Sequence, residues 1–271
     1  MLPATTMNDR FHQVTAHRLQ SMGITAMELT SNHSFPRHTH DEYGIGVMLS
    51  GGQRSWSGIG QVEALQGDVI TVNPGELHDG HPLDGRIRRW RIIYFDPKAL
   101  VRFFMPDLAR EIEFISPSLR DPRTAARVNM LFGRLSNGAD RLGVEELVTH
   151  LMLRLRSPNI RPMRDGTRHS ASVAKARARI EEDPSSRIRL FDLAALSGMS
   201  RYQIVRSFAR EVGTTPYAYV IQCRVRLAQK MLANGETLAG AAQRAGFADQ
   251  SHMTRAFVRQ LGISPGRYKA A

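Results

Sequence analysis

Apolar and polar positions alternate with a short period over the first third of the chain. Between residues 24 and 95, brief apolar stretches are separated by Gly, Pro, Asn and Asp. Tyr43, Ile45 and Val47 recur at every second position, which is the period of a half-buried β-strand. Further strands are predicted at residues 53–57, 61–65, 68–72 and 86–95. Many short strands at regular spacing indicate an antiparallel sandwich or barrel.

The next segment changes to a helical period. Asp121 followed by Pro122 is typical of a helix start, because an acidic N-cap and a first-turn proline both suit the unpaired N–H groups there. We expect one helix from this point to Gly138, and a second over residues 144–155 that Pro158 interrupts. Two such helices form a hairpin. The pattern leaves open whether this hairpin covers the barrel or mediates dimerisation.

Residues 157–170 have the composition of a linker. The segment SPNIRPMRDGTRHS is rich in Pro, Gly and Arg and poor in residues that build a core. We therefore predict two domains: an N-terminal all-β barrel with its helical hairpin over residues 1–156, and an all-α domain over residues 171–271. The linker of residues 157–170 joins them.

The C-terminal third contains an internal repeat. Matching residues recur 48 positions apart before a turn and 49 apart after it: Leu190 and Leu238, Ala194 and Ala242, Gly198 and Gly246, Met199 and Phe247, Arg206 and Arg255, Phe208 and Phe257, Gly213 and Gly262, Pro216 and Pro265, Tyr219 and Tyr268. Each copy predicts a short helix, a glycine turn and a longer helix, which is a helix-turn-helix unit. The longer helices span residues 201–211 and 250–260, and one helix over residues 217–233 separates the two units.

The outer faces of the two longer helices carry side chains suited to nucleic acid. These residues are Arg201, Tyr202, Val205 and Arg206 in the first copy, and Gln250, Ser251, His252 and Arg255 in the second. Polar side chains there match base edges and phosphates in a major groove, and an apolar valine can meet a thymine methyl group. The alternative is that the arginines cap or pair within the protein. Two such helices held apart would enter successive major grooves about 34 Å apart.

The charge distribution favours the same partner. The chain has a formal net charge of +12, and residues 170–271 hold 16 basic against 7 acidic side chains. Positive charge concentrated in one region attracts a phosphate backbone through Coulomb forces and counterion release. A merely solvated basic surface is the alternative.

Other classes of protein fit the sequence poorly. No apolar run is long enough to span a membrane, and the first residues lack an apolar signal core, so we expect a cytoplasmic protein. The single cysteine, Cys223, cannot form an internal disulfide and is expected to be buried. Nothing resembles a nucleophile elbow, a phosphate loop or a dinucleotide fingerprint, so we expect no enzyme.

The repeated segments identify a family. SGMSRYQIVRSFAREVGTTPYAYV and AGFADQSHMTRAFVRQLGISPGRYK closely resemble the paired helix-turn-helix domain of AraC-type transcription regulators. The resemblance implies that seven of these outer-face residues, all except Arg201, contact DNA and that the chain regulates transcription sequence-specifically. It implies four partners: duplex promoter DNA, a small-molecule effector, a second copy of the chain and RNA polymerase. Activation and repression both remain open.

The resemblance extends over the barrel. His38-Thr-His40-Asp-Glu42, and later Gly67-Asp68 with Asn73-Pro-Gly-Glu-Leu-His78, look like the two boxes of a cupin-type barrel, which implies an effector-binding and dimerisation domain. Small barrels enclose ligand cavities. The expected effector contacts are His38, His40, Glu42, Tyr43, Trp56, His78 and Trp90.

The histidines of these boxes also raise the question of a metal. His38 and His40 are two residues apart and share one face if they lie on a strand, where His78 and a carboxylate could complete a transition-metal site. A metal-binding cupin, however, carries a glutamate at the position of Gly44. The alternatives are hydrogen bonding within the barrel mouth and direct contact with an organic effector. We expect the direct contact, with no metal and no cofactor.

Overall fold

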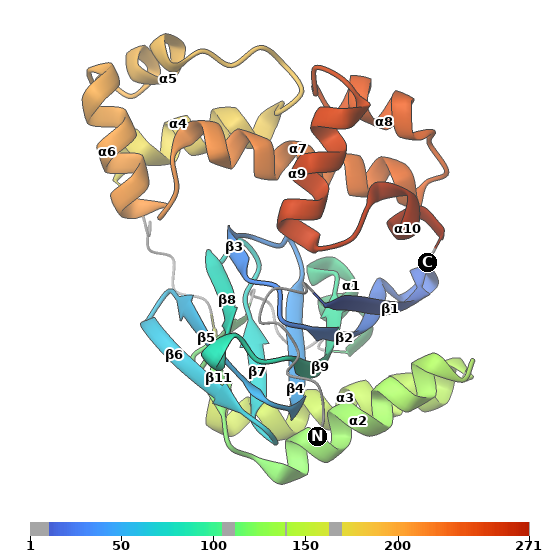
Figure 1. Ribbon diagram of the computed structural model, residues 1–271. Coiled ribbons are helices and arrows are strands. Elements are labelled where there is room, and N and C mark those ends of the chain that lie inside the picture. The colour runs from blue at the N-terminus through green and yellow to red at the C-terminus, as the bar shows by residue number, and fades with distance from the viewer. Residues whose placement is uncertain (1–10, 105–111, 139, 163–169, 271) are drawn as a thin grey trace, which may run out of the picture. The chain divides into compact units, whose positions relative to one another are not determined.

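The computed structural model describes residues 11–104, 112–138, 140–162 and 170–270. The chain forms a β-rich unit followed by a helical unit (Figure 1). Residues 35–38 form β3, and its hydrogen bonds to β8 make it a strand of the β-rich unit. Among the described residues, no helix has the length and apolar character needed to cross a bilayer.

Two antiparallel sheets build the β-rich unit and confirm the predicted barrel-like class. The larger has the order β1 (His12–Leu19), β2 (Ile24–Ser31), β9 (Arg88–Phe95), β4 (Tyr43–Ser50), β7 (Val69–Val72) and β11 (Ser118–Leu119). The smaller has the order β3 (Phe35–His38), β8 (His78–Pro82), β5 (Gly52–Ser57) and β6 (Gly60–Leu65). A separate pair joins β10 (Ile112–Phe114) to β12 (Ile160–Pro162).

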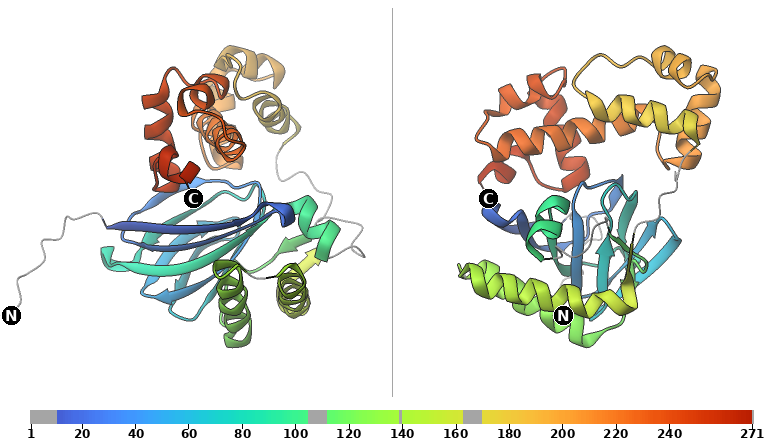
Figure 2. Two further views of the ribbon diagram at one scale, coloured as in Figure 1. Left: turned by 90° about the vertical axis from the view of Figure 1, so that its right-hand side faces the viewer. Right: turned by 180° about the vertical axis from the view of Figure 1, so that it is seen from behind.

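Two helices cover one face of the larger sheet. Helix α2 (Pro122–Ser136) begins at the predicted N-cap Asp121, and α3 (Arg141–Asn159) follows it. Figure 2 shows both helices beneath the sheet. Their apolar sides form one core with β4 and β9, which includes Val128, Leu131, Val148, Leu151, Ile45 and Ile93. The hairpin therefore does cover the barrel. A third helix, α1 (Pro97–Phe104), follows β9.

The end of this unit lies later than the pattern predicts. Helix α3 continues through Pro158 to Asn159, and β12 then pairs with β10. The Asn159 side chain accepts a hydrogen bond from the backbone N–H of Ser116 at 2.6 Å, which fastens the helix end to the preceding loop. Residues 157–162 of the predicted linker thus belong to the β-rich unit, and residues 163–169 lie outside the described residues.

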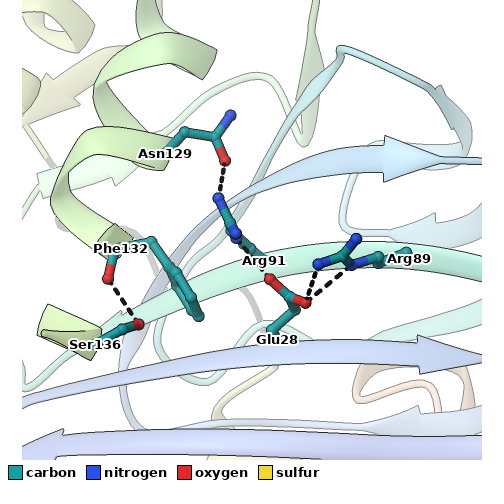
Figure 3. A network of polar contacts seen from close by, with 6 residues as sticks. All are labelled: Glu28, Arg89, Arg91, Asn129, Phe132 and Ser136. Atoms are coloured by element: carbon teal, nitrogen blue, oxygen red, sulfur yellow. Dashed lines mark hydrogen bonds and ion pairs between the residues drawn. The ribbon is translucent and has the colours of Figure 1, made fainter. Parts of the chain in front are cut away.

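A polar network fastens α2 to the sheet (Figure 3). Glu28 of β2 accepts hydrogen bonds from Arg89 and Arg91 of β9, and Arg91 also donates to the Asn129 side chain of α2 at 2.8 Å. The Arg91 guanidinium lies 4.5 Å from the ring centroid of Phe132. Burial alone would raise the pKa of Glu28, but the hydrogen bonds from Arg91 and Arg89 outweigh it and hold that pKa below its ordinary value.

The helical unit contains two separate apolar cores that share one helix. It comprises α4 (Ala171–Glu182), α5 (Leu190–Leu196), α6 (Arg201–Glu211), α7 (Pro216–Ala233), α8 (Leu238–Arg244), α9 (Gln250–Leu261) and α10 (Pro265–Ala270). The first half of α7 packs with α4–α6, and its second half packs with α8 and α9. Cys223 is buried in the first core, as predicted. The helix predicted between the two repeats, α7, thus contributes side chains to both cores.

The two turn glycines make a matched stability test. Gly198 and Gly246 both have positive φ, at 63° and 80°, which costs other L-residues about 1–2 kcal/mol. A Cβ on Gly198 would meet nothing within 4 Å, whereas one on Gly246 would lie 2.4 Å from the backbone oxygen of Ser185. We expect G198A to lower the free energy of unfolding by that strain alone, and G246A to lower it clearly more. Denaturant titrations followed by helical circular dichroism check this; equal losses would contradict the close approach at Gly246.

Candidate nucleic-acid interface and ligand site

The first predicted reading helix, α6, begins at a complete capping box. The Ser200 hydroxyl accepts from the backbone N–H of Gln203, and the Gln203 side chain accepts from the N–H of Ser200 at 2.9 Å. This arrangement satisfies two of the unpaired donors at the helix start. Ile204 and Phe208 on the opposite face are fully buried in the first core. Burial of these two residues fixes which side of α6 is turned outward.

The second reading helix, α9, repeats this design with different residues. Its N-cap Asp249 accepts from the N–H of His252 at 2.6 Å, and its C-cap Gly262 is left-handed with φ 74°. Met253 and Phe257 are fully buried in the second core. The rings of His252 and Phe247 pack edge-to-face, with ring centroids 5.3 Å apart.

The repeated phenylalanine and tyrosine meet in both copies. Phe208 packs edge-to-face on Tyr219 at 5.5 Å between ring centroids, and Phe257 packs in the same way on Tyr268 at 5.2 Å. Each pair locks a reading helix against the helix that follows it. The matching Phe and Tyr positions of the repeat are thus explained by packing.

The eight predicted DNA contacts divide by exposure. Val205 and His252 are half-buried, and the other six are exposed on the surface of α6 or α9: Arg201, Tyr202, Arg206, Gln250, Ser251 and Arg255. The Arg206 guanidinium donates to the Tyr202 hydroxyl at 3.0 Å and lies 5.4 Å from its ring centroid. Arg206 and Arg255 are both exposed, so neither is buried as a structural cap. Each helix presents a cationic and polar face of the kind that contacts phosphates and base edges.

The histidines of the two boxes converge in the β-rich unit. His38 ends β3, His40 lies in the loop after it, and His78 begins β8. One ligand atom from each lies within 4.8 Å of the others. We expected His38 and His40 to lie on one face of a strand. This is wrong, because β3 ends at His38. The loop nevertheless brings His40 back, and its ring lies 4.9 Å from that of His78.

Tyr94 belongs to this cluster although the sequence did not single it out. Its ring lies 5.0 Å from that of His40. Burial, and secondarily the negative charge of Glu42, raise the pKa of the Tyr94 phenol well above its ordinary value, so Tyr94 stays protonated. Burial also lowers the pKa of His78 to about 4, against a smaller opposing effect of its bond to the Glu76 carbonyl. His78 is therefore neutral at pH 7.

The structure does not bring Tyr43 to the histidines. The Tyr43 hydroxyl donates to the backbone oxygen of Ile112 at 2.8 Å, and its ring packs on Phe114 in the core under the helices. Gly44, its neighbour on β4, faces the other way: a Cβ there would lie 3.3 Å from the Tyr94 ring. Tyr43 thus occupies the opposite side of the sheet from the histidine cluster.

The two tryptophans lie on different sheets. Trp90 is buried on β9 and shares a strand face with Tyr94, because these residues are four positions apart. The guanidinium of the fully buried Arg88 lies 4.7 Å from the Trp90 ring centroid. Trp56 is half-buried on β5, and its backbone N–H donates to Asp79 at 2.6 Å. Arg88 and Tyr94 were missed, although the alternation along β9 places both on the face of Trp90.

Comparison with known proteins agrees with this division of the chain. Residues 22–152 match the family model of the AraC-like ligand binding domain, and residues 193–271 match a helix-turn-helix domain. The chain is 33% identical over 233 residues to the uncharacterized HTH-type transcriptional regulator YbfI of Bacillus subtilis, covering 81% of each chain. It is 25% identical over 256 residues to the MmsAB operon regulatory protein of Pseudomonas aeruginosa, covering 88% of this chain and 78% of that protein.

A solved structure shares the two-unit fold. The crystal structure of ToxT from Vibrio cholerae O395 matches with a TM-score of 0.56 and 12% identity, over 96% of this chain and 97% of that one. At this identity the likeness concerns the fold alone. The Bacillus subtilis relative, which matches over 81% of both chains, and the two domain matches together confirm the family that the repeated segments indicated. The chain belongs to the AraC-type transcription regulators.

Proposed function

We propose that this regulator reads its operator by inserting α6 and α9 into successive major grooves. The observation that carries the proposal is the pair of exposed polar faces, each set by buried residues on its opposite side and by a capped helix start. Arg206 and Arg255 stand at matching positions of the repeat. In this arrangement both arginines contact bases or phosphates, and half-buried Val205 contacts a thymine methyl group.

The β-rich unit is proposed to bind the small-molecule effector through the side that carries the histidine cluster. His38, His40 and His78 converge there, with Glu42 close enough to influence Tyr94. Trp90 lies on the same face of β9 as Tyr94 and extends this surface. We assign Trp56 to the effector site from its sequence pattern. Tyr43 instead supports the site from the helix side of the sheet.

Several finer properties belong to the same proposal. The chain acts in the cytoplasm as a regulator without enzymatic activity, as a homodimer, and it contacts RNA polymerase at promoters that it activates. Exposed apolar side chains on the hairpin offer contacts that a second copy of the chain could cover. Met130 of α2 is 59% exposed, and Leu142 and Leu153 of α3 are 74% and 58% exposed.

Selection of bound genomic fragments, followed by binding titrations, tests the DNA-reading proposal. We expect the selected duplex to bind at least about 1,000-fold more tightly than a random duplex of equal length at physiological salt. Affinity for both duplexes should fall as salt rises, because binding releases counterions. Equal affinity for the two duplexes would reduce the chain to a non-specific DNA binder and would refute operator reading.

A further inference from the structure

The two histidine boxes share a local geometry that orients their rings. His38 and His78 each hydrogen-bond through Nδ1 to the backbone oxygen two residues earlier, that of Pro36 at 2.7 Å and that of Glu76 at 3.0 Å. A carbonyl oxygen only accepts, so in both rings Nδ1 carries a proton, and in the neutral form of each ring Nε2 carries the lone pair. Metal-binding histidines are oriented in this same way by a backbone carbonyl behind the ring.

These two rings meet a third imidazole. His40 supplies it from the loop after β3, and one ligand atom of each histidine lies within 4.8 Å of the others. Around tetrahedral Zn²⁺, with bonds of about 2.0–2.1 Å, neighbouring nitrogens lie about 3.3 Å apart. The cluster therefore needs to contract by no more than about 1.5 Å to bind such an ion. Small rotations of the three rings can supply that movement.

The position at which metal-binding cupins carry a fourth protein ligand has no carboxylate here. Gly44 stands where metal-binding cupins carry a glutamate, and a Cβ there would already lie 3.2 Å from Ile92 and 3.3 Å from Tyr94. Gly44 itself supplies no carboxylate, so the three histidines would provide three nitrogens and leave a coordination position for water or an effector atom. Three imidazoles with an open position suit Zn²⁺, Fe²⁺, Ni²⁺ or Cu²⁺ better than the hard cations Mg²⁺ and Ca²⁺.

We propose that His38, His40 and His78 bind a divalent transition-metal ion that forms part of the effector site. The inference replaces our expectation of direct effector contact without a metal, and it rests on the proposed function only in assigning ligand binding to this unit. Three converging imidazoles favour a metal over an organic oxygen, because at most one of these lone pairs can bond to any single O–H donor. The Tyr94 ring, 5.0 Å from that of His40, lies against the same cluster.

The test measures metal binding directly on full-length protein purified without a histidine tag. After removal of metals with a chelator, the protein is titrated with Zn²⁺ by calorimetry and with Co²⁺ by visible absorption. We expect one ion to bind per chain. The visible absorption of the bound Co²⁺ should be that of an ion in a site of low coordination symmetry. H40Q and H78Q should each weaken Zn²⁺ binding at least about 100-fold. Removing a residue that only hydrogen-bonds to a metal ligand already weakens binding by up to about 100-fold, and here the ligand itself is lost.

H81Q is the matched control. His81 lies three residues after His78 on β8, but its side chain is 49% exposed and 3.8 Å from Asp79. This variant should keep wild-type binding. Because His40 lies in a loop, H40Q retains the sheet and decides the question if H78Q fails to fold. Less than about a tenth of an equivalent of bound ion at saturating Zn²⁺, or equal losses in H40Q and H81Q, overturns the proposal.

Operator binding by the same samples separates this inference from the proposed function. If the protein binds its operator specifically but no metal, the metal site alone is wrong. If it binds metal but shows no preference for the operator, the DNA-reading proposal fails while the metal site stands.

Discussion

Replacing Arg206 and Arg255 together with alanine is expected to abolish most of the preference for the operator. A bidentate contact between an arginine and guanine contributes about 1–3 kcal/mol, so the pair contributes about 2–6 kcal/mol if their effects add. Addition is expected because Arg206 lies on α6 and Arg255 on α9, and these helices pack in different cores. The measurement is fluorescence anisotropy of operator and random duplexes, titrated with each protein at one fixed salt concentration. The expected loss for the operator is at least about 30-fold.

A charge-matched control separates base reading from bulk electrostatics. Arg86 and Arg123 are exposed residues of the β-rich unit, and R86A/R123A removes the same two positive charges from the chain. This variant should keep nearly all of the operator preference. R206A/R255A should also reduce the salt dependence if the arginines contact phosphates, whereas base contacts alone leave the slope unchanged. Similar operator affinities for the two double variants would remove both arginines from the interface.

The helical unit was predictable because each repeated residue has a local structural role. Gly198 and Gly246 adopt positive φ at the turn, and Phe208 and Phe257 fill the two cores. These roles depend on neighbours within one repeat, and the same residue pattern occurs in both copies. The same locality explains why the hairpin start at Asp121 was found.

The ligand site depends on pairing between distant strands and was only partly predictable. Nearly all of β4 is buried, so its alternation shows two faces without showing which one meets the histidines. Tyr43 was therefore placed on the wrong side of the sheet. Strand β1 was missed because it is an edge strand that buries no residue fully, and only its first half alternates exposed and half-buried residues. Pro158 did not end α3 where expected, since β10–β12 pairing and Asn159 hold the helix end in place.

The division of the helical unit into two cores predicts the second large effect. Phe208 and Phe257 are both fully buried, one in each core. Replacing either with alanine should cost about 3–5 kcal/mol of unfolding free energy, because it removes an aromatic side chain and leaves a cavity. The exposed Phe191 of α5, at 68% exposure, is the matched control, and F191A should change that free energy by less than about 0.5 kcal/mol.

Hydrogen exchange shows where each loss falls. If the cores are separate, F257A should reduce amide protection in α8–α10 and leave α4–α6 protected, and F208A should do the reverse. Helix α7 supplies side chains to both cores, so only the half that faces the altered core should exchange faster. Loss of protection throughout the unit in either variant would mean that α7 couples the cores into one cooperative body. In that case a change at α6 would affect α9 through α7. The losses of binding free energy from R206A and R255A would then no longer add.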